Sequence, residues 1–169
     1  MRLENLAAKY FAMSEEVWER HANPWSVWTR YSCLPLLIAC IWWREILDIW
    51  FWPTLVVLMV WIWINPRCFK KPRHTRHWAS QSVLGERILI YQPEIIPPHH
   101  SKMLDIISIL LCIFTVLCVA GLFFHEVIST CVGAVGLILT KTWFLDRMVW
   151  LYHEVDNANR MNKSINSEK

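Results

Sequence analysis

Histidines and carboxylates that could serve as ligands or as acid–base groups lie in a few short segments of this sequence. The segment TKTWFLDRMVWLYHE places Asp146 and His153 two helical turns apart on one face. Glu86 lies in a polar stretch between two apolar runs. A carboxylate and an imidazole brought together can exchange protons with a substrate. Asp146, His153 and Glu86 are therefore the candidate catalytic residues.

The same groups suggest a metal site. The adjacent pair His99 and His100 precedes an apolar run, and His153 follows another. Imidazole and carboxylate are ligands for divalent metals such as zinc. No single helix carries a ligand pair spaced His-x-x-x-His, so a site with His99, His100 and His153 must be assembled from several elements. A divalent metal is accordingly the cofactor that the sequence suggests.

Cations and polar groups near the same apolar runs suggest an anionic ligand. The segment RCFKKPRHTRHW interleaves cations with aromatic rings, which suits phospholipid headgroups at about 1 kcal/mol per cation. The candidate ligand-binding residues are His21, Asn23, Arg67, Arg87 and Arg147. The structural alternative is that Asp146 and its neighbours form salt bridges at a membrane interface. Nucleic acid is not an expected partner, because this basic pattern is ordinary in loops facing the inner leaflet.

Composition and hydropathy indicate the elements that must position these residues. The chain has 169 residues, 55% of them hydrophobic, with twelve Trp and only four Gly. Trp is typical of membrane interfaces, where its ring lies in lipid and its N–H among the headgroups. The N-terminal residues are acidic and lack the apolar core of a signal peptide. Five of the six cysteines lie in apolar runs, where they are expected to pack as small hydrophobic residues.

The fold class predicted is all-α integral membrane, with one membrane domain over residues 1–169. An amphipathic helix is expected at 1–22, with Ser14 as a position where the helix could restart. The four transmembrane helices are predicted at residues 25–43, 49–64, 103–124 and 127–145. A cytoplasmic basic loop is predicted at 66–102, with a short helix at 79–91, and a disordered tail at 156–169.

The charge distribution predicts the orientation of the chain. Four crossings place both termini and the 66–102 loop on one side, with sixteen of the seventeen Lys and Arg residues. Arg44 is alone on the other side. By the positive-inside rule the basic side is the cytoplasm. The sequence thus predicts a multi-pass protein of the inner (plasma) membrane, with both termini cytoplasmic and membrane lipids as partners.

Small residues in the last apolar run predict close helix packing. They are spaced three or four apart, at Ser129, Gly133, Gly136 and Thr140. Such stripes allow helix backbones to approach each other in lipid. Packing within the chain is the first interpretation, and a homo-oligomer contact is the alternative.

Several blocks of sequence resemble the motif set of a family of small bacterial membrane proteins, a domain of unknown function. The blocks are HANPWSVWTR, NPRCF, WASQSVLGERI, PPHH and KTWFLDRMVWLY, which together reach from His21 to Tyr152. The resemblance implies a four-span fold and brings no activity, substrate or cofactor. The matching polar and charged positions include His21, Asn23, Asn65, Arg67, Glu86, Arg87, His99, His100, Asp146 and Arg147.

These observations favour a polar site at the cytoplasmic interface that binds a lipid headgroup or a small amphipathic ligand, with metal-assisted chemistry as an extension. One alternative is an oligomeric transporter or channel subunit lined by Ser129, Thr130 and Thr140. Against it, the apolar runs carry almost no ionisable residue. Another alternative is a structural or assembly partner without chemistry. The sequence leaves open whether the protein is an enzyme.

Overall fold

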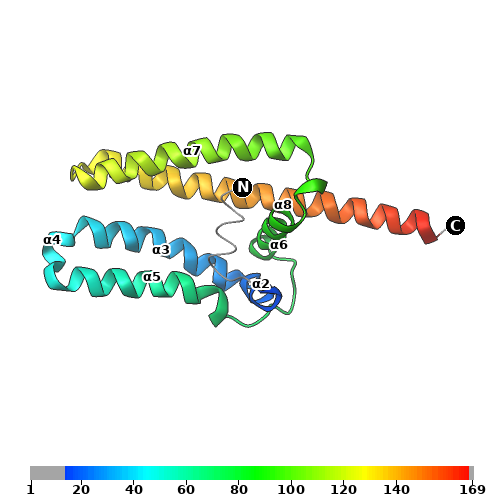
Figure 1. Cartoon of the computed structure of the whole chain (residues 1–169), viewed down its shortest axis with the longest axis horizontal. Coiled ribbons are helices and arrows are strands. Elements are labelled where there is room, and N and C mark those ends of the chain that lie inside the picture. The colour runs from blue at the N-terminus through cyan, green and yellow to red at the C-terminus, as the bar shows by residue number, and fades with distance from the viewer. Residues whose placement is uncertain (1–13, 168–169) are drawn as a thin grey trace.

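The computed structural model describes residues 14–167, and all regular secondary structure in this range is helical (Figure 1). Most of the predicted amphipathic helix at 1–22 lies outside the described residues. The elements are α2 (Glu15–His21), α3 (Pro24–Trp42), α4 (Arg44–Leu47), η1 (Asp48–Trp50), α5 (Phe51–Cys68), α6 (Trp78–Tyr91), η2 (Pro93–Ile95), α7 (Pro98–Phe123) and α8 (Val127–Ser167).

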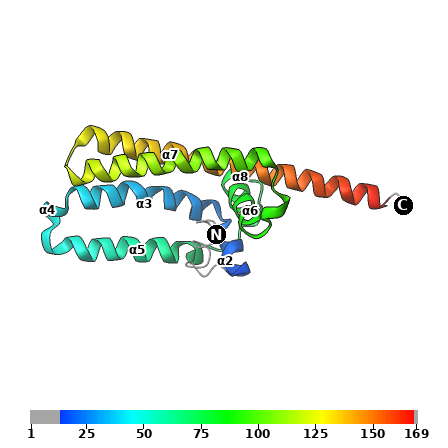
Figure 2. The same ribbon diagram turned by 45° about the horizontal axis from the view of Figure 1, so that its top comes forward.

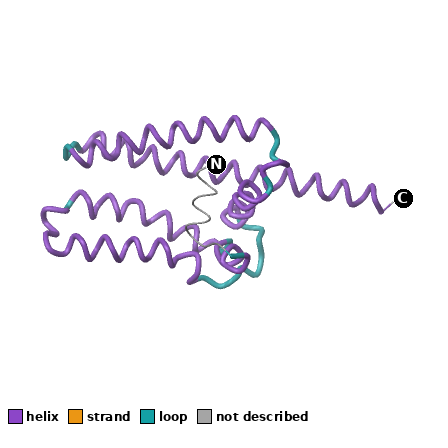
Figure 3. Tube along the Cα trace, viewed as in Figure 1, coloured by secondary structure: helices purple, strands orange, loops and turns teal. Residues whose placement is uncertain are grey.

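The long helices form two antiparallel hairpins. In the first, α3 and α5 are joined by α4 and η1, and in the second a tight turn joins α7 to α8 (Figures 1 and 2). The helix α6 crosses the end of the hairpins opposite these turns and packs mainly on α8, while α2 packs on α5. Loops occupy only short stretches between the helices (Figure 3).

Local capping explains where the first helices begin. The Ser14 side chain accepts a hydrogen bond from the Val17 backbone N–H at 3.4 Å, so α2 starts at the predicted restart. The Asn23 side chain accepts from the Trp25 backbone N–H at 3.0 Å, and Pro24 takes the first position of α3. The chain therefore turns sharply between α2 and α3, which directs His21 back toward α3.

Among the residues that the structure describes, three helical segments are long and apolar enough to cross a membrane: Arg44–Cys68, Pro98–Phe123 and Val127–Ile165. The most apolar stretch of the first segment contains no buried residue, with Val57 66% and Trp52 67% accessible. So large an exposed apolar surface is rare on a protein in water. These helices are compatible with a membrane protein. The fourth expected span coincides with α3.

In the second hairpin, α7 and α8 pack closely against each other. A Cβ on Gly133 would lie 2.5 Å from the Cys118 backbone nitrogen, and one on Gly136 would meet the Phe114 ring. Both glycines therefore face α7 within the chain, as the first interpretation of the small-residue stripe predicted. At the turn, the Glu126 carboxylate accepts from the backbone N–H of Ser129 at 2.6 Å. Hydrogen bonds from Ser129 lower the pKa of Glu126.

The structure differs from the sequence prediction at some helix ends. The tail expected to be disordered continues α8 to Ser167, because a helix anchored by packing extends without a new nucleation step. An ion pair between Arg160 and Asp156, at 2.9 Å, supports it. The helix α5 continues through Pro66 to Cys68, since a proline in the last turn removes a single hydrogen bond.

Candidate functional site

A polar pocket lies where α2, α3, α6 and α8 meet, at the end of the hairpins that carries α6. Its volume is about 120 Å³. The polar side chains that line it are His21, Arg30, Glu86 and Lys141, and the apolar ones are Val27, Val83, Phe144 and Leu145. The pocket thus gathers four ionisable groups from four separate helices.

The helices place these groups through specific packing contacts. A Cβ on Gly85 would lie 1.9 Å from the Met148 carbonyl oxygen, so α6 touches the α8 backbone at this point. The next residue, Glu86, is thereby directed toward the pocket. The rings of Trp28 and Trp78 stack with centroids 6.0 Å apart and hold the start of α6 against α3.

The His21 ring is buried and bonded through both nitrogens. Its Nε2 lies 2.7 Å from Arg30 Nη1, and its Nδ1 lies 3.0 Å from Ser26 Oγ. Because a guanidinium can only donate, Nε2 accepts and the proton is assigned to Nδ1. Burial lowers the pKa of His21 well below its usual value, and the charges on Arg30 and Lys141 lower it further. The imidazole in this pocket is therefore neutral.

A chain of hydrogen bonds continues from the buried His21 into the first hairpin. Ser26 Oγ donates to Asn65 Oδ1 at 3.0 Å, and Asn65 Nδ2 donates to Thr29 Oγ1 at 2.8 Å. Thr29 in turn donates to the Trp25 carbonyl at 2.7 Å. Each buried donor thus meets an acceptor, which fixes α5 against α3 at the level of the pocket.

The pocket carries an excess of positive charge. Glu86 interacts electrostatically with both Arg30 and Lys141, so one carboxylate faces two cations. The neutral His21 adds no charge, so it does not offset the two cations. Two cations facing one carboxylate give the pocket a positive potential, which attracts an anion.

The three candidate catalytic residues lie apart. Glu86 lines the pocket, whereas Asp146 Oδ1 accepts a hydrogen bond from Trp78 Nε1 at 3.2 Å. His153 Nε2 lies 3.2 Å from Gln81 Oε1 on α6. Each of the last two therefore ties α8 to α6.

The side chains of the candidate ligand-binding residues other than His21 are also held by contacts with other residues of the protein. Asn23 donates to the Lys70 carbonyl at 2.8 Å, and Arg87 pairs with Glu15. Arg67 donates to the Trp63 carbonyl at 2.6 Å with its guanidinium 4.3 Å from the ring centroid.

Arg147 makes a similar contact, because its guanidinium lies 5.3 Å from the Trp150 ring centroid. These contacts place the four residues around the pocket end of the molecule, outside the pocket lining.

Two of the predicted metal ligands come together with a carboxylate. His99 Nε2 and His100 Nε2 lie 3.2 Å and 3.0 Å from the same oxygen, Glu154 Oε2. One ligand atom from each of the three residues lies within 4.8 Å of the others. His153, the third predicted ligand, bonds Gln81 instead and is not part of this group.

Three residues of these two clusters were not selected from the sequence. They are Arg30 and Lys141 in the pocket and Glu154 beside the histidine pair. A usable signal existed for the first two, because a lone cation within an apolar helix usually marks a functional position. The role of Glu154 depends on how α7 meets α8, which no local pattern encodes.

The whole chain matches one family model, over residues 2–168. This protein belongs to DUF6653, a family of unknown function. The predicted membership of a domain-of-unknown-function family is thereby confirmed. No curated protein and no solved structure matches the chain.

Proposed function

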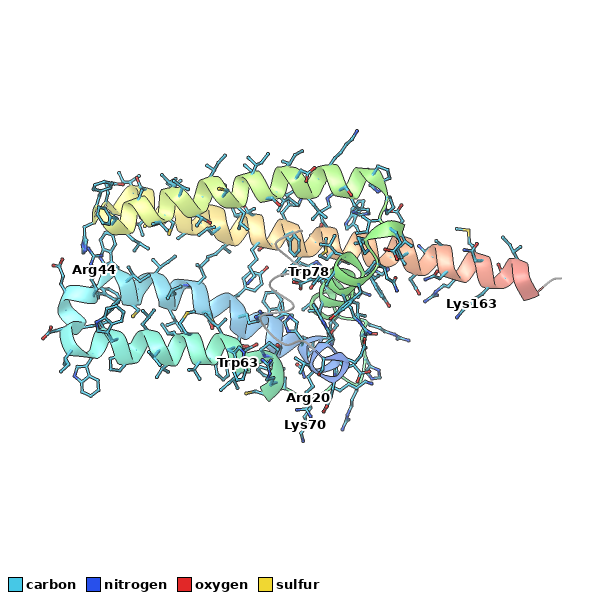
Figure 4. The ribbon with its side chains drawn as sticks, viewed as in Figure 1. Arg20, Arg44, Trp63, Lys70, Trp78 and Lys163 are labelled. Atoms are coloured by element: carbon cyan, nitrogen blue, oxygen red, sulfur yellow. The ribbon has the colours of Figure 1, made fainter. Side chains whose placement is uncertain are left out.

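We propose that this DUF6653 protein crosses the inner membrane four times, with α3 as the fourth span and both termini in the cytoplasm. The two hairpin turns lie at the same end, since Arg44 Nη1 donates to the Leu122 carbonyl at 3.0 Å. The helix α3 runs antiparallel to α5 over 19 residues, about 28 Å, so it covers the same depth. Figure 4 shows Arg44 at this end and Arg20 and Lys70 at the other, which supports the orientation.

Within this topology, we propose that the pocket binds the anionic headgroup of an inner-leaflet phospholipid. The observation that carries the proposal is that Arg30 and Lys141 face a single carboxylate, Glu86, at the end of the hairpins that carries α6. Guanidinium and ammonium groups are the usual ligands of phosphate in proteins. The neutral His21 keeps the Arg30 guanidinium oriented toward the pocket.

The size of the pocket limits what it can hold. At about 120 Å³ it is smaller than the clefts that hold drug-sized ligands, about 300–1,000 Å³. A phosphate group with part of its headgroup suits this volume, whereas the acyl chains would lie along the exposed apolar helix faces. Free phosphate shares the same chemistry but lacks the chains.

The test measures lipid retained by the purified protein. The protein is extracted in mild detergent, mixed with phosphatidylglycerol or phosphatidylcholine, and analysed by native mass spectrometry. We expect selective retention of phosphatidylglycerol, reduced at least about tenfold in the Arg30→Gln and Lys141→Gln variants, a loss equivalent to about 1.4 kcal/mol. Arg87→Gln is the matched control, because Arg87 is a cation of the same side that pairs with Glu15 outside the pocket.

Thermal melting accompanies every variant, so that loss of folding is distinguished from loss of binding. A parallel titration with inorganic phosphate separates the two sources of the anion: a lipid site retains phosphatidylglycerol at phosphate concentrations that saturate a free-phosphate site. Equal retention in folded Arg30→Gln, Lys141→Gln and Arg87→Gln proteins would overturn the proposal.

A further inference from the structure

We infer that His99, His100 and Glu154 form a binding site for one divalent transition-metal ion of the zinc class. The site joins the first turn of α7 to the part of α8 beyond its apolar segment. It is separate from the anion pocket, because Lys141 and Glu154 are thirteen residues apart on one helix, or about 20 Å. The inference therefore does not depend on the proposed lipid binding.

The distances suit metal coordination. With zinc–ligand bonds of about 2.0–2.2 Å, the ligand atoms of a tetrahedral site lie about 3.4 Å apart. The two observed nitrogen–oxygen distances are 3.2 and 3.0 Å, both to Glu154 Oε2. The imidazole rings of His99 and His100 lie beside each other with centroids 4.4 Å apart. Small side-chain rotations would bring all three atoms around one ion.

The donor set selects the class of metal. Two imidazoles and one carboxylate suit zinc, cobalt, nickel or iron(II), whereas magnesium and calcium prefer oxygen ligands alone. Three protein ligands are also the number found in catalytic zinc sites, where water or substrate completes the coordination. An ion held here would accordingly keep at least one position for an exogenous oxygen ligand.

The three proposed ligands differ in burial, so one side of the site is held in the core and the other is open to solvent. His100 is 2% exposed, with Leu104 and Leu151 among the buried residues of the neighbouring core. Its Nδ1 is buried without a hydrogen-bond partner among the described residues, so Nε2, which lies 3.0 Å from Glu154 Oε2, is the nitrogen that can meet an ion. His99 and Glu154 are exposed, which gives an ion access from solvent.

A simple ion pair is the competing interpretation of the same geometry. In that case Glu154 only accepts hydrogen bonds from two imidazoles, and the site has no preference among cations. The interpretations differ in stoichiometry and spectroscopy. A metal site binds one ion tightly and gives cobalt(II) the intense visible absorption of a low-coordinate N/O environment.

The experiment uses the full-length protein, purified in detergent without a histidine tag and treated with a chelator. Isothermal titration with Zn²⁺ should show one site of micromolar or better affinity, and Co²⁺ should give the visible spectrum. The variants His99→Ala, His100→Ala and Glu154→Gln should each weaken Zn²⁺ binding at least about tenfold. His153→Ala is the matched control, because this neighbouring histidine bonds Gln81 instead and should leave binding unchanged.

Glu154→Gln also separates ligation from folding, since the amide can still hydrogen-bond the imidazoles but is a poor ligand. Melting curves must show that each variant is folded before its affinity is compared. Absence of stoichiometric Zn²⁺ and Co²⁺ binding to the folded wild type would overturn the inference. So would an equal loss of affinity in His153→Ala. Neither outcome bears on lipid retention by the Arg30 and Lys141 pocket.

Discussion

His21 shows how a single residue links the hydrogen-bond chain to the charge of the pocket. Its Nδ1 proton is committed to Ser26, and its Nε2 lone pair is committed to Arg30. A second proton on the ring would have to displace the guanidinium, with Lys141 adding further repulsion. Neutrality of this histidine is therefore a condition of the folded structure.

This condition predicts a pH dependence of stability. The folded-state pKa of His21 is lowered, so the unfolded state binds a proton that the folded state rejects. The stabilisation is fully present above about pH 6.5 and is lost as the pH falls below that value, by up to about 1.4 kcal/mol per unit. The melting temperature should decrease more between pH 7.5 and pH 5.5 for the wild type than for the His21→Gln variant. Equal decreases in melting temperature for the two proteins would contradict the prediction.

Asp146 gives a second prediction at this scale. Its Oδ1 accepts a hydrogen bond from Trp78 Nε1, and the amide oxygen of asparagine can do the same. Asp146→Asn should therefore melt close to wild type, whereas Asp146→Ala should lose about 1 kcal/mol with the hydrogen bond. Phosphatidylglycerol retention should be unchanged in both. A folded Asp146→Asn protein that loses the lipid would instead place this carboxylate in the binding machinery.

At the residue level, the sequence pointed to some members of each cluster but not to the partners that the structure brings beside them. His21 and Glu86 were selected and line the pocket, and His99 and His100 were selected and adjoin each other. The partners Arg30, Lys141 and Glu154 come from other helices. Helical spacing identifies residues that share a face, but only tertiary packing determines which faces meet.

At the scale of the element, α6 is the helix on which the site depends most. It lies across the hairpin ends and contacts α8 so closely at Gly85 that no Cβ fits. It also supplies Glu86 to the pocket. Any displacement of α6 therefore changes the pocket.

Gly85→Ala tests this dependence. The added Cβ would meet the Met148 carbonyl, a backbone atom that cannot move aside without shifting a helix. We expect a loss of about 2–3 kcal/mol in stability, together with weaker phosphatidylglycerol retention. Asn157→Ala, at an exposed position of the same helix as Met148, should stay within about 0.5 kcal/mol of wild type. Similar melting of the two variants would show that α6 accommodates the insertion.

The helices were largely predictable because periodicity and apolar runs are local signals. The break at Asn23-Pro24 and the restart at Ser14 follow from capping chemistry. The helical tail was not predicted, since its polar composition hides the continuity with a packed helix. The position of α6 over the hairpin ends depends on contacts of Gly85 and Trp78 that lie more than sixty residues away in sequence.

At the scale of the whole molecule, the proposed four-span topology makes a direct prediction. Single cysteines are introduced in place of Glu45, Glu126, Arg73 and Lys163 in a cysteine-free background. A membrane-impermeant maleimide added to intact cells should label the first two only, because they adjoin the hairpin turns. In permeabilised cells, which serve as the control, all four cysteines should be labelled. Labelling at Arg73 or Lys163 in intact cells would refute the four-span model with cytoplasmic termini.

The length of α8 has an electrostatic consequence for this topology. From Asp156 to Ser167 the helix continues for about 16 Å beyond its contacts with α6 and α7 (Figure 1). The potential of an anionic leaflet decays over about 8 Å at physiological ionic strength. In the proposed topology, Arg147 lies near the lipid surface, and Lys163 lies about 24 Å further along the same helix, which is three screening lengths. A molecule that docks on the distal turns would meet bulk solution rather than the ion atmosphere of the bilayer.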